Sequence, residues 1–286
     1  MAMPALEVQP RTAAGGLPPT ATGDRIFQLD VLRGWAILGI LAVNAIAFAW
    51  PFQVMMSEAP PPGATSQADL IGVWVTDVFF HDKFRTLFTM LFGVSIFLVG
   101  GEKSDEARGA LLWRRLLWLG LFKSGYLHGR APLWTYFLII LVGGANLAAF
   151  AVWGWQDTMA GEADPTKGLA AAAGGAAFLI TLFYASILIL LVRFGLRPLV
   201  AWLAPVGRMA FTNYLTQTLI MVTLYYAPWG PMWFGQQGPA EMWMVVGAIW
   251  AAQIIWSPLW LSVFTMGPLE WIWRCLTYGR MVPIRP

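Results

Sequence analysis

The chain has 286 residues, of which 58% are hydrophobic and 12% are charged, and its formal net charge at pH 7 is +3. A chain this long and this apolar is too hydrophobic for a soluble domain, so its composition predicts an all-α, polytopic transmembrane helical bundle. The small basic excess lies beside apolar runs, which indicates membrane topology and the lipid bilayer as partner rather than nucleic-acid binding.

The first 28 residues are rich in Pro, Gly, Ala and Thr and carry scattered charges. Such a segment cannot bury enough apolar surface to fold, so the sequence predicts a disordered tail over residues 1–28. Apolar runs recur throughout the remainder of the chain. We therefore expect residues 29–286 to form a single transmembrane domain.

The first apolar run, residues 31–50, carries its polar groups on one helical stripe. Asp30 and Arg33 lie at its mouth, and Asn44 follows eleven residues after Arg33, on nearly the same face. Because lipid offers polar groups no hydrogen-bond partner, we expect all three to face a polar site inside the bundle. In the alternative interpretation, Arg33 is an orientation anchor in the headgroups with Asp30 as its surface partner, which leaves Asn44 unexplained.

The second apolar segment, residues 70–100, is too long for one straight span and contains a polar insert from His81 to Arg85. The sequence predicts a kink, a tilt or a re-entrant break near His81. Asp82 beside the imidazole suggests a general base, and a structural polar kink is the alternative. Lys83 and Arg85 are candidates for holding an anionic headgroup or a phosphate-bearing donor, with snorkelling as the alternative.

Basic residues crowd residues 103–130 and recur after later apolar runs, which predicts cytoplasmic loops. Residues 109–127 are expected to form an interfacial or re-entrant helix; a crossing there would add a seventh span and reverse half of the assignments. Both termini are then expected in the cytoplasm. The predicted spans are residues 31–50, 70–100 (broken near 81), 132–154, 168–192, 206–226 and 240–265.

The span at residues 206–226 begins with Arg208 and places Asn213 and Gln217 one helical turn apart. These three residues are candidates for substrate binding, and hydrogen bonding between helices is the alternative explanation for the two amides. Residues 267–274 alternate aromatic and charged groups, which predicts an interfacial helix in which Glu270 pairs with Arg274. Two histidines and one cysteine make a metal site improbable, and no cofactor-binding loop is present.

Four motifs, LDVLRGWAILGILAVN, KFRTLFTMLFGVSIFL, GRMAFTNYLTQTLI and GPLEWIWRCLTYGR, occur in this order. In this pattern the chain resembles the YeiB-like family of bacterial inner-membrane proteins, named as domain of unknown function 418. It is shorter than a typical relative around residues 114–130, where two motifs are fused. The first-span pattern is also similar to that of membrane acyltransferases, and the resemblance carries over Asp30, Arg33 and Gly34.

The acyltransferase resemblance implies transfer of an acyl group from a cytoplasmic thioester, such as an acyl coenzyme A, to an envelope sugar or lipid. In this hypothesis Asp30 and Arg33 position the site, Asn44 polarises a carbonyl group, and His81 is the base. O-antigen acyltransferases carry a histidine where this chain has Asn44, which leaves His81 as the nearest substitute. The alternatives are a transporter or permease-like bundle for a small solute, and an inactive partner subunit.

Overall fold

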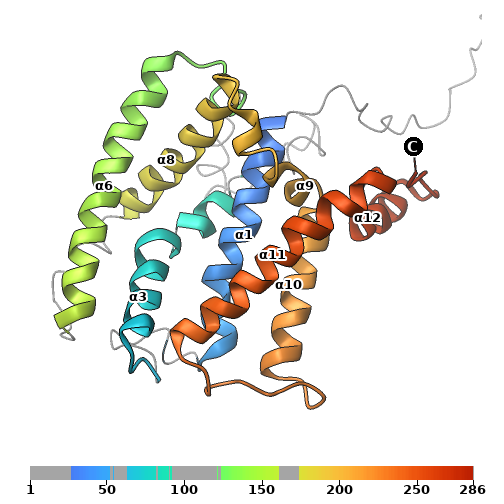
Figure 1. Ribbon diagram of the computed structural model, residues 1–286. Helices are drawn as coiled ribbons and strands as arrows, with labels where there is room; N and C mark the ends of the chain where they lie inside the picture. The colour runs from blue at the N-terminus through green and yellow to red at the C-terminus, as the bar shows by residue number, and fades with distance from the viewer. Residues whose placement is uncertain are drawn as a thin grey trace, which may run out of the picture.

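In the computed structural model, residues 27–51, 54, 63–81, 83–89, 91, 121, 124–160 and 174–285 are described, and all of their regular structure is helical, as predicted (Figure 1). Residues 1–26 of the tail predicted over residues 1–28, and most of the predicted interfacial helix at 109–127, lie outside these residues. Phe27 and Gln28, the last two residues of the predicted tail, are instead the first residues of α1. The elements are α1 (Phe27–Ala49), α3 (Gln67–Val75), the π-helix η2 (Thr76–Phe80), α6 (Leu133–Ala160), α8 (Gly174–Arg193), the 3-10 helix η3 (Arg197–Leu199), α9 (Leu203–Arg208), α10 (Ala210–Tyr225), α11 (Pro239–Val263) and α12 (Pro268–Tyr278).

Three helices in the described part of the chain are long and apolar enough to cross a membrane: Phe27–Ala49, Leu133–Gln156 and Pro239–Val263. The apolar helix Ala177–Arg193 is shorter. The length and composition of these helices indicate a membrane protein, whereas the count of six spans stays a prediction. The predicted span at residues 206–226 differs from the structure, because the chain turns at Met209 and divides that segment between α9 and α10.

Helix α1 forms the centre of the bundle. Two-thirds of its apolar stretch (67%) is buried, compared with 6% for the corresponding stretch of α6, which lies at the edge. One buried cluster joins Leu32 and Val43 of α1 to the helical residues 83–89 and to α8, and another joins Leu41 to α10 and α11. An aromatic group at mid-height connects these clusters, with the rings of Phe80 and Phe84 stacked at 5.1 Å.

The crossing of α1 and α9 depends on two glycines that face each other. A Cβ atom added to Gly34 would lie 2.0 Å from the carbonyl oxygen of Leu203, and one added to Gly207 would lie 1.9 Å from the carbonyl oxygen of Asp30. Small residues allow two helix backbones to approach closely, which is a common packing device in membranes. This contact positions the charged start of α1, at Asp30, against the end of α9, at Gly207.

The two ends of the bundle differ in charge. At one end, Arg193 donates a hydrogen bond to the carbonyl of Ala131 (2.7 Å), and Arg197 lies over the ring of Phe27. The elements at this basic end include the start of α1, the end of α8, α9 and α12 (Figure 1). These elements and the residues next to them in the chain carry Arg33, Arg130, Arg193, Arg197, Arg208, Arg274, Arg280 and Arg285. At the opposite, acidic end, the described residues from 144 to 160, 63 to 75 and 226 to 245 include carboxylates but neither lysine nor arginine.

At the acidic end, Asp69 connects α3 to α11 through hydrogen bonds. Its carboxylate accepts hydrogen bonds from the hydroxyl of Ser66 (2.7 Å) and from the amide of Ala240 (3.0 Å) in the first turn of α11. These bonds, that of Ser66 first, hold the pKa of the Asp69 carboxyl below its usual value of 3.8. A charged carboxylate also suits the positive end of the α11 dipole. One side chain thereby joins α3 to the start of α11.

We expect Asp69→Asn to lower the free energy of unfolding in detergent by about 1 kcal/mol at neutral pH, a typical effect of losing a helix-capping side chain. Because the folded-state pKa is lowered, the contribution of Asp69 is complete above the unfolded-state pKa and is lost as the pH falls through the folded-state value. Thermal unfolding of both proteins should therefore converge below pH 3.8. A constant difference from pH 7 into that range would contradict this role.

Candidate functional site

The predicted break near His81 is confirmed. Helix α3 ends at Val75, η2 continues as a π-helix to Phe80, and the backbone becomes extended at His81 (φ −54°, ψ 134°) before residues 83–89 turn helical again. The amide of His81 donates to the carbonyl of Thr76 (2.8 Å), five residues earlier. Single π-helical turns of this kind often occur at functional sites.

Side chains of Lys83 and of α8 bind backbone carbonyl groups on both sides of the break. The ammonium group of Lys83 donates to the carbonyl of Asp77 (2.7 Å), and the hydroxyl of Tyr184 on α8 donates to that of Phe79 (3.1 Å). Thr181, also on α8, donates to the carbonyl of Lys83 itself (2.9 Å). Irregular backbone at membrane depth is tolerated when its polar groups are satisfied in this way. The break is therefore stabilised by specific hydrogen bonds within the fold.

Lys83 is almost fully buried (5% exposed), and its ammonium group lies 5.2 Å from the ring centre of Phe150 on α6. The bond to the Asp77 carbonyl gives this predicted substrate-binding residue a structural contact that holds the break in place. Arg85, two residues later, is exposed. Of the two cations predicted to hold an anion, Arg85 is thus the one with an accessible side chain.

His81 and Asp77 form the titratable pair of the break. The Nδ1 atom of His81 lies 3.9 Å from the Oδ1 atom of Asp77, and their side chains are 46% and 59% exposed. This separation is longer than a hydrogen bond, although catalytic pairs often tighten only when substrate binds. The sequence had suggested Asp82 as the carboxylate, whose side chain lies outside the described residues. Asp77 was missed, and its i, i+4 spacing from His81 was the available signal.

The residues predicted on the stripe of α1 lie at different heights. Asp30 is buried (6% exposed) and accepts a contact from the guanidinium of Arg33 at 3.4 Å, at the basic end. Asn44 lies eleven residues further along, or about 16 Å at the rise of an α-helix. Between them Ile37 and Leu41 are buried in apolar clusters. The structure thus brings Asp30 and Arg33 together but separates them from Asn44.

Asn213 and Gln217 lie in a buried polar ladder between α10, α11 and α1. The side-chain amide of Gln217 donates to Gln253 Oε1 (2.7 Å) and to the carbonyl of Ile37 (3.3 Å), and that of Asn213 donates to Ser257 Oγ (3.1 Å). Gln253 in turn donates to the carbonyl of Asn213 (2.9 Å). These contacts link helices, which is the structural alternative weighed for the two amides.

Two further residues singled out in the sequence, Arg208 and Glu270, lie at the basic end, and the contact predicted for Glu270 differs from the structure. Arg208, a predicted substrate-binding residue, donates to the carbonyl of Thr265 at 3.1 Å. Glu270 was expected to pair with Arg274, but its carboxylate accepts from the amides of Phe211 (2.8 Å) and Thr212 at the start of α10. The free amides of a helix N-terminus attract a carboxylate more specifically than the half-buried side chain of Arg274 does.

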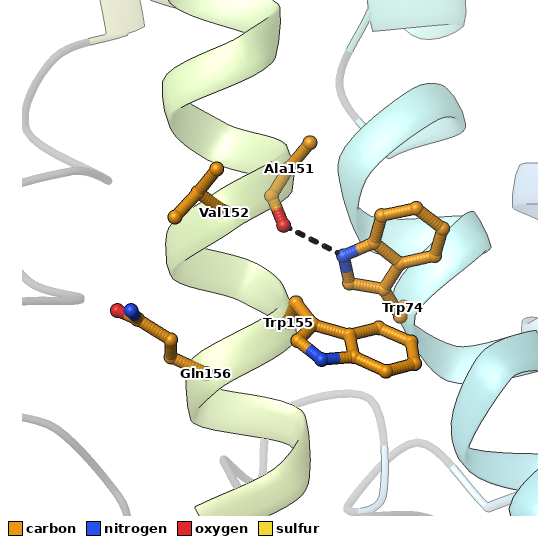
Figure 2. Close-up of a pocket in the computed structure, with 5 residues that line it drawn as sticks. All are labelled: Trp74, Ala151, Val152, Trp155 and Gln156. Carbon is orange, nitrogen blue, oxygen red and sulfur yellow. Dashed lines mark hydrogen bonds between the residues drawn. The ribbon is translucent and has the colours of Figure 1, made fainter.

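A shallow apolar groove lies beside the break, between α3 and α6. Figure 2 shows the residues that line it, Trp74, Ala151, Val152, Trp155 and Gln156. The indole of Trp74 donates to the carbonyl of Ala151 (2.9 Å), and the rings of Trp74 and Trp155 meet edge to face at 5.5 Å. Since Phe150 of α6 covers Lys83, the groove and the break are neighbours along α6.

Residues 119–280 match the profile of a family described as "Protein of unknown function (DUF418)". Over 207 residues the chain is 34% identical to the Escherichia coli (strain K12) "Uncharacterized protein YeiB", covering 65% of this chain and 47% of that protein. Over 110 residues it is 38% identical to the Bacillus subtilis (strain 168) "Uncharacterized protein YxaH", covering 38% of this chain and 27% of that protein. The matches thus span less than half of each of these relatives.

A third relative, the "Uncharacterized 39.9 kDa protein in amylase 3'region" of Bacillus acidopullulyticus, is 24% identical over 354 aligned positions, which cover 94% of this chain and 98% of that protein. Because that alignment is longer than this chain, the relative carries residues within the matched region that this chain lacks. No solved structure matches the chain.

Proposed function

The chain belongs to the DUF418 family of proteins of unknown function, and from that premise we propose that it is a membrane-embedded acyltransferase of the bacterial cytoplasmic membrane. The proposed reaction transfers an acyl group from a thioester to a hydroxyl group of an envelope sugar or lipid. The observation that carries the proposal is the His81–Asp77 pair at the helix break. The acyltransferase resemblance of the first span adds to it.

The proposed membrane orientation follows from the charge difference between the two ends. Arginine gathers at the end that holds the start of α1, the end of α8 and α12, and the positive-inside rule assigns such an end to the cytoplasm. The acidic end then faces outward. In this orientation both termini are cytoplasmic, and a cytoplasmic thioester would approach from the side of Asp30 and Arg33.

In the proposed chemistry His81 removes the proton from the acceptor hydroxyl, whose oxygen attacks the thioester carbonyl carbon. The carbon–sulfur bond then breaks, and the sulfur leaves as a thiol that takes the proton from the imidazolium. Asp77 orients the imidazole and stabilises its charged form. The exposed guanidinium of Arg85, four residues after His81, is suited to a phosphate group on either substrate.

The groove of Figure 2 suits the apolar part of a substrate. It is lined by two indole rings and two aliphatic side chains, with a single polar residue, Gln156. An acyl chain bound there would lie next to the break, because α6 borders both. Lys83 would serve as a positioning residue that holds the π-helical turn in place. The roles that the resemblance implies for Asp30, Arg33 and Asn44 do not combine in one site, because Asp30 and Arg33 lie at the basic end, apart from Asn44.

Solute transport has less support, because the amide donors of the polar ladder that would bind the solute are already engaged in contacts within the bundle. Gln217 and Gln253 bind each other, and Asn213 binds Ser257 and the backbone of α9. The third hypothesis, an inactive partner subunit, predicts that no acyl transfer occurs. These alternatives make different predictions for an activity assay.

The direct test is an assay with purified protein in vesicles containing bacterial envelope lipids and glycans. Radiolabelled acetyl coenzyme A serves as the donor probe, and label is measured in the extracted lipid and glycan fractions. We expect incorporation above that of protein-free vesicles, with one thiol released for each ester formed. Hydrolysis alone, or incorporation equal to that of protein-free vesicles with short- and long-chain donors alike, would contradict the proposed function.

A further inference from the structure

Helix α12 and the residues that follow it form one folded unit at the basic end, where α12 projects beyond the other helices (Figure 1). Gly279 ends the helix in the left-handed conformation (φ 61°), which lets the chain turn back. The indole of Trp271 then donates to the carbonyl of Val282 (2.7 Å), and the amide of Val282 donates to the sulfur of Cys275 (3.4 Å). The returning segment is thereby fastened to the helix.

This unit exposes large apolar side chains. On a helix of 3.6 residues per turn, Ile272, Trp273 and Leu276 fall within an arc of about 100°. Met281 on the returning segment adds to them. Their exposed fractions are 44% for Ile272, 62% for Trp273, 74% for Leu276 and 75% for Met281. A continuous apolar face of this size requires a partner that removes it from water.

The same unit carries positive charge beside its apolar face. Arg280 and Arg285 are exposed, and Arg274 is half-buried. The acidic residue of the unit, Glu270, does not offset them at the surface, because its carboxylate accepts the amides of Phe211 and Thr212 on α10. The charge that α12 presents to its surroundings is therefore basic.

The position of α12 indicates which partner it meets. Helix α11, one of the three described helices long enough to span a membrane, ends at Val263, and only four residues separate it from the start of α12 at Pro268. An amphipathic helix joined this closely to a span lies at the membrane boundary, where acyl chains and headgroups are its neighbours. Arginine flanking an apolar face matches the phosphates of an anionic leaflet.

We propose that α12 and residues 279–285 lie in the headgroup layer at the basic end and bind anionic phospholipids. Ile272 and Leu276 reach the acyl chains, and Arg280 and Arg285 bind headgroup phosphates. This inference rests on the membrane orientation proposed above and is independent of the chemistry of His81. Loss of acyl transfer in a His81 variant would therefore leave lipid binding at α12 unchanged.

The test uses the full-length protein with Cys275→Ser, reconstituted in bilayers, and a fluorescent thiol label at Leu276→Cys. The neighbouring Thr277→Cys, about 100° around the helix, is the matched control. Quenching is measured with brominated phosphatidylglycerol and with brominated phosphatidylcholine at equal mole fractions. A second protein carries Arg280→Gln and Arg285→Gln, which change only exposed side chains and thus preserve the fold.

We expect the label at residue 276 to be quenched by brominated chains much more than the label at 277. We further expect phosphatidylglycerol to be favoured about fivefold or more, since a single interfacial arginine already contributes about 1 kcal/mol. The double arginine variant should keep the quenching but lose the preference. Equal quenching at residues 276 and 277, equal quenching by the two lipids, or quenching by neither lipid because protein covers the face would overturn the proposal.

Discussion

Replacement of His81 by alanine is expected to lower the rate of acyl transfer by about 10²–10⁴-fold, the usual contribution of a general base. The loss should appear in kcat, because the imidazole acts on the reacting proton and not on substrate binding. His81→Gln should be as inactive, since an amide forms hydrogen bonds but does not accept the proton at neutral pH. Asp77→Asn should cause a smaller loss, about tenfold, because it disturbs only the orientation of the imidazole.

A purely structural role for His81 would give a different pattern. The bond that defines the π-turn joins the backbone amide of His81 to the carbonyl of Thr76, and alanine keeps it. We therefore expect the thermal unfolding midpoint of His81→Ala to stay close to that of the wild type. If His81→Ala unfolds earlier and His81→Gln restores both stability and transfer, His81 is a polar kink and the catalytic assignment is wrong.

Replacement of Gly207 by alanine is expected to destabilise the bundle strongly. The added methyl group would lie 1.9 Å from the carbonyl oxygen of Asp30 and 2.7 Å from the amide nitrogen of Gly34. Both atoms belong to the backbone of α1, so no side chain can swing aside. The helices would have to separate and expose the buried apolar side chains around Val31 and Val206. We expect a loss of about 3 kcal/mol, the upper part of the range for overpacking.

Gly247 on α11 provides the matched control, because a Cβ added there would meet nothing within 4 Å. Gly247→Ala should therefore raise stability slightly, by up to about 1 kcal/mol, through its better helix propensity. Thermal unfolding in the same detergent compares the two variants. Equal effects at Gly207 and Gly247 would show that α1 and α9 do not cross as described.

The break of the second segment was predictable because the physical constraint is local. Thirty helical residues exceed the thickness of a bilayer, and the polar insert at His81 marks where the helix yields. The sequence carried a signal for the carboxylate as well, but adjacency pointed to Asp82. Asp77 lies four residues before His81, a helical spacing that places its Oδ1 atom 3.9 Å from the imidazole Nδ1 atom.

The polar ladder shows that the sequence also does not predict which polar groups meet between helices. Asn213 and Gln217 stand out in the sequence, because two amides one turn apart within an apolar run form a polar stripe. Gln253 and Ser257 have the same spacing, but they lie in a longer apolar helix, where nothing in the sequence marks them as a polar stripe. Which stripe meets which depends on how α10 packs against α11, and no local pattern encodes that packing.

The division of the span predicted at residues 206–226 has a similar origin. Local hydrophobicity continues through Met209, but α9 must lie close to α1 at Gly207 and then turn before α10 begins. Glu270 likewise serves the start of α10 because folding brings it there, although Arg274 is nearer in sequence. In both cases tertiary contacts overrode the prediction that the local sequence favours.

The most direct measurement is the reactivity of a cysteine at position 81 toward a membrane-impermeant maleimide, in sealed vesicles with Cys275→Ser. If the break presents His81 to a wet site, His81→Cys reacts from one side of the membrane. Controls are Thr76→Cys, 3% exposed and buried in protein, and Leu141→Cys, 70% exposed on α6 and facing lipid, neither of which should react. A cysteine at position 81 as unreactive as that at 141 from both sides would contradict a catalytic site at the break.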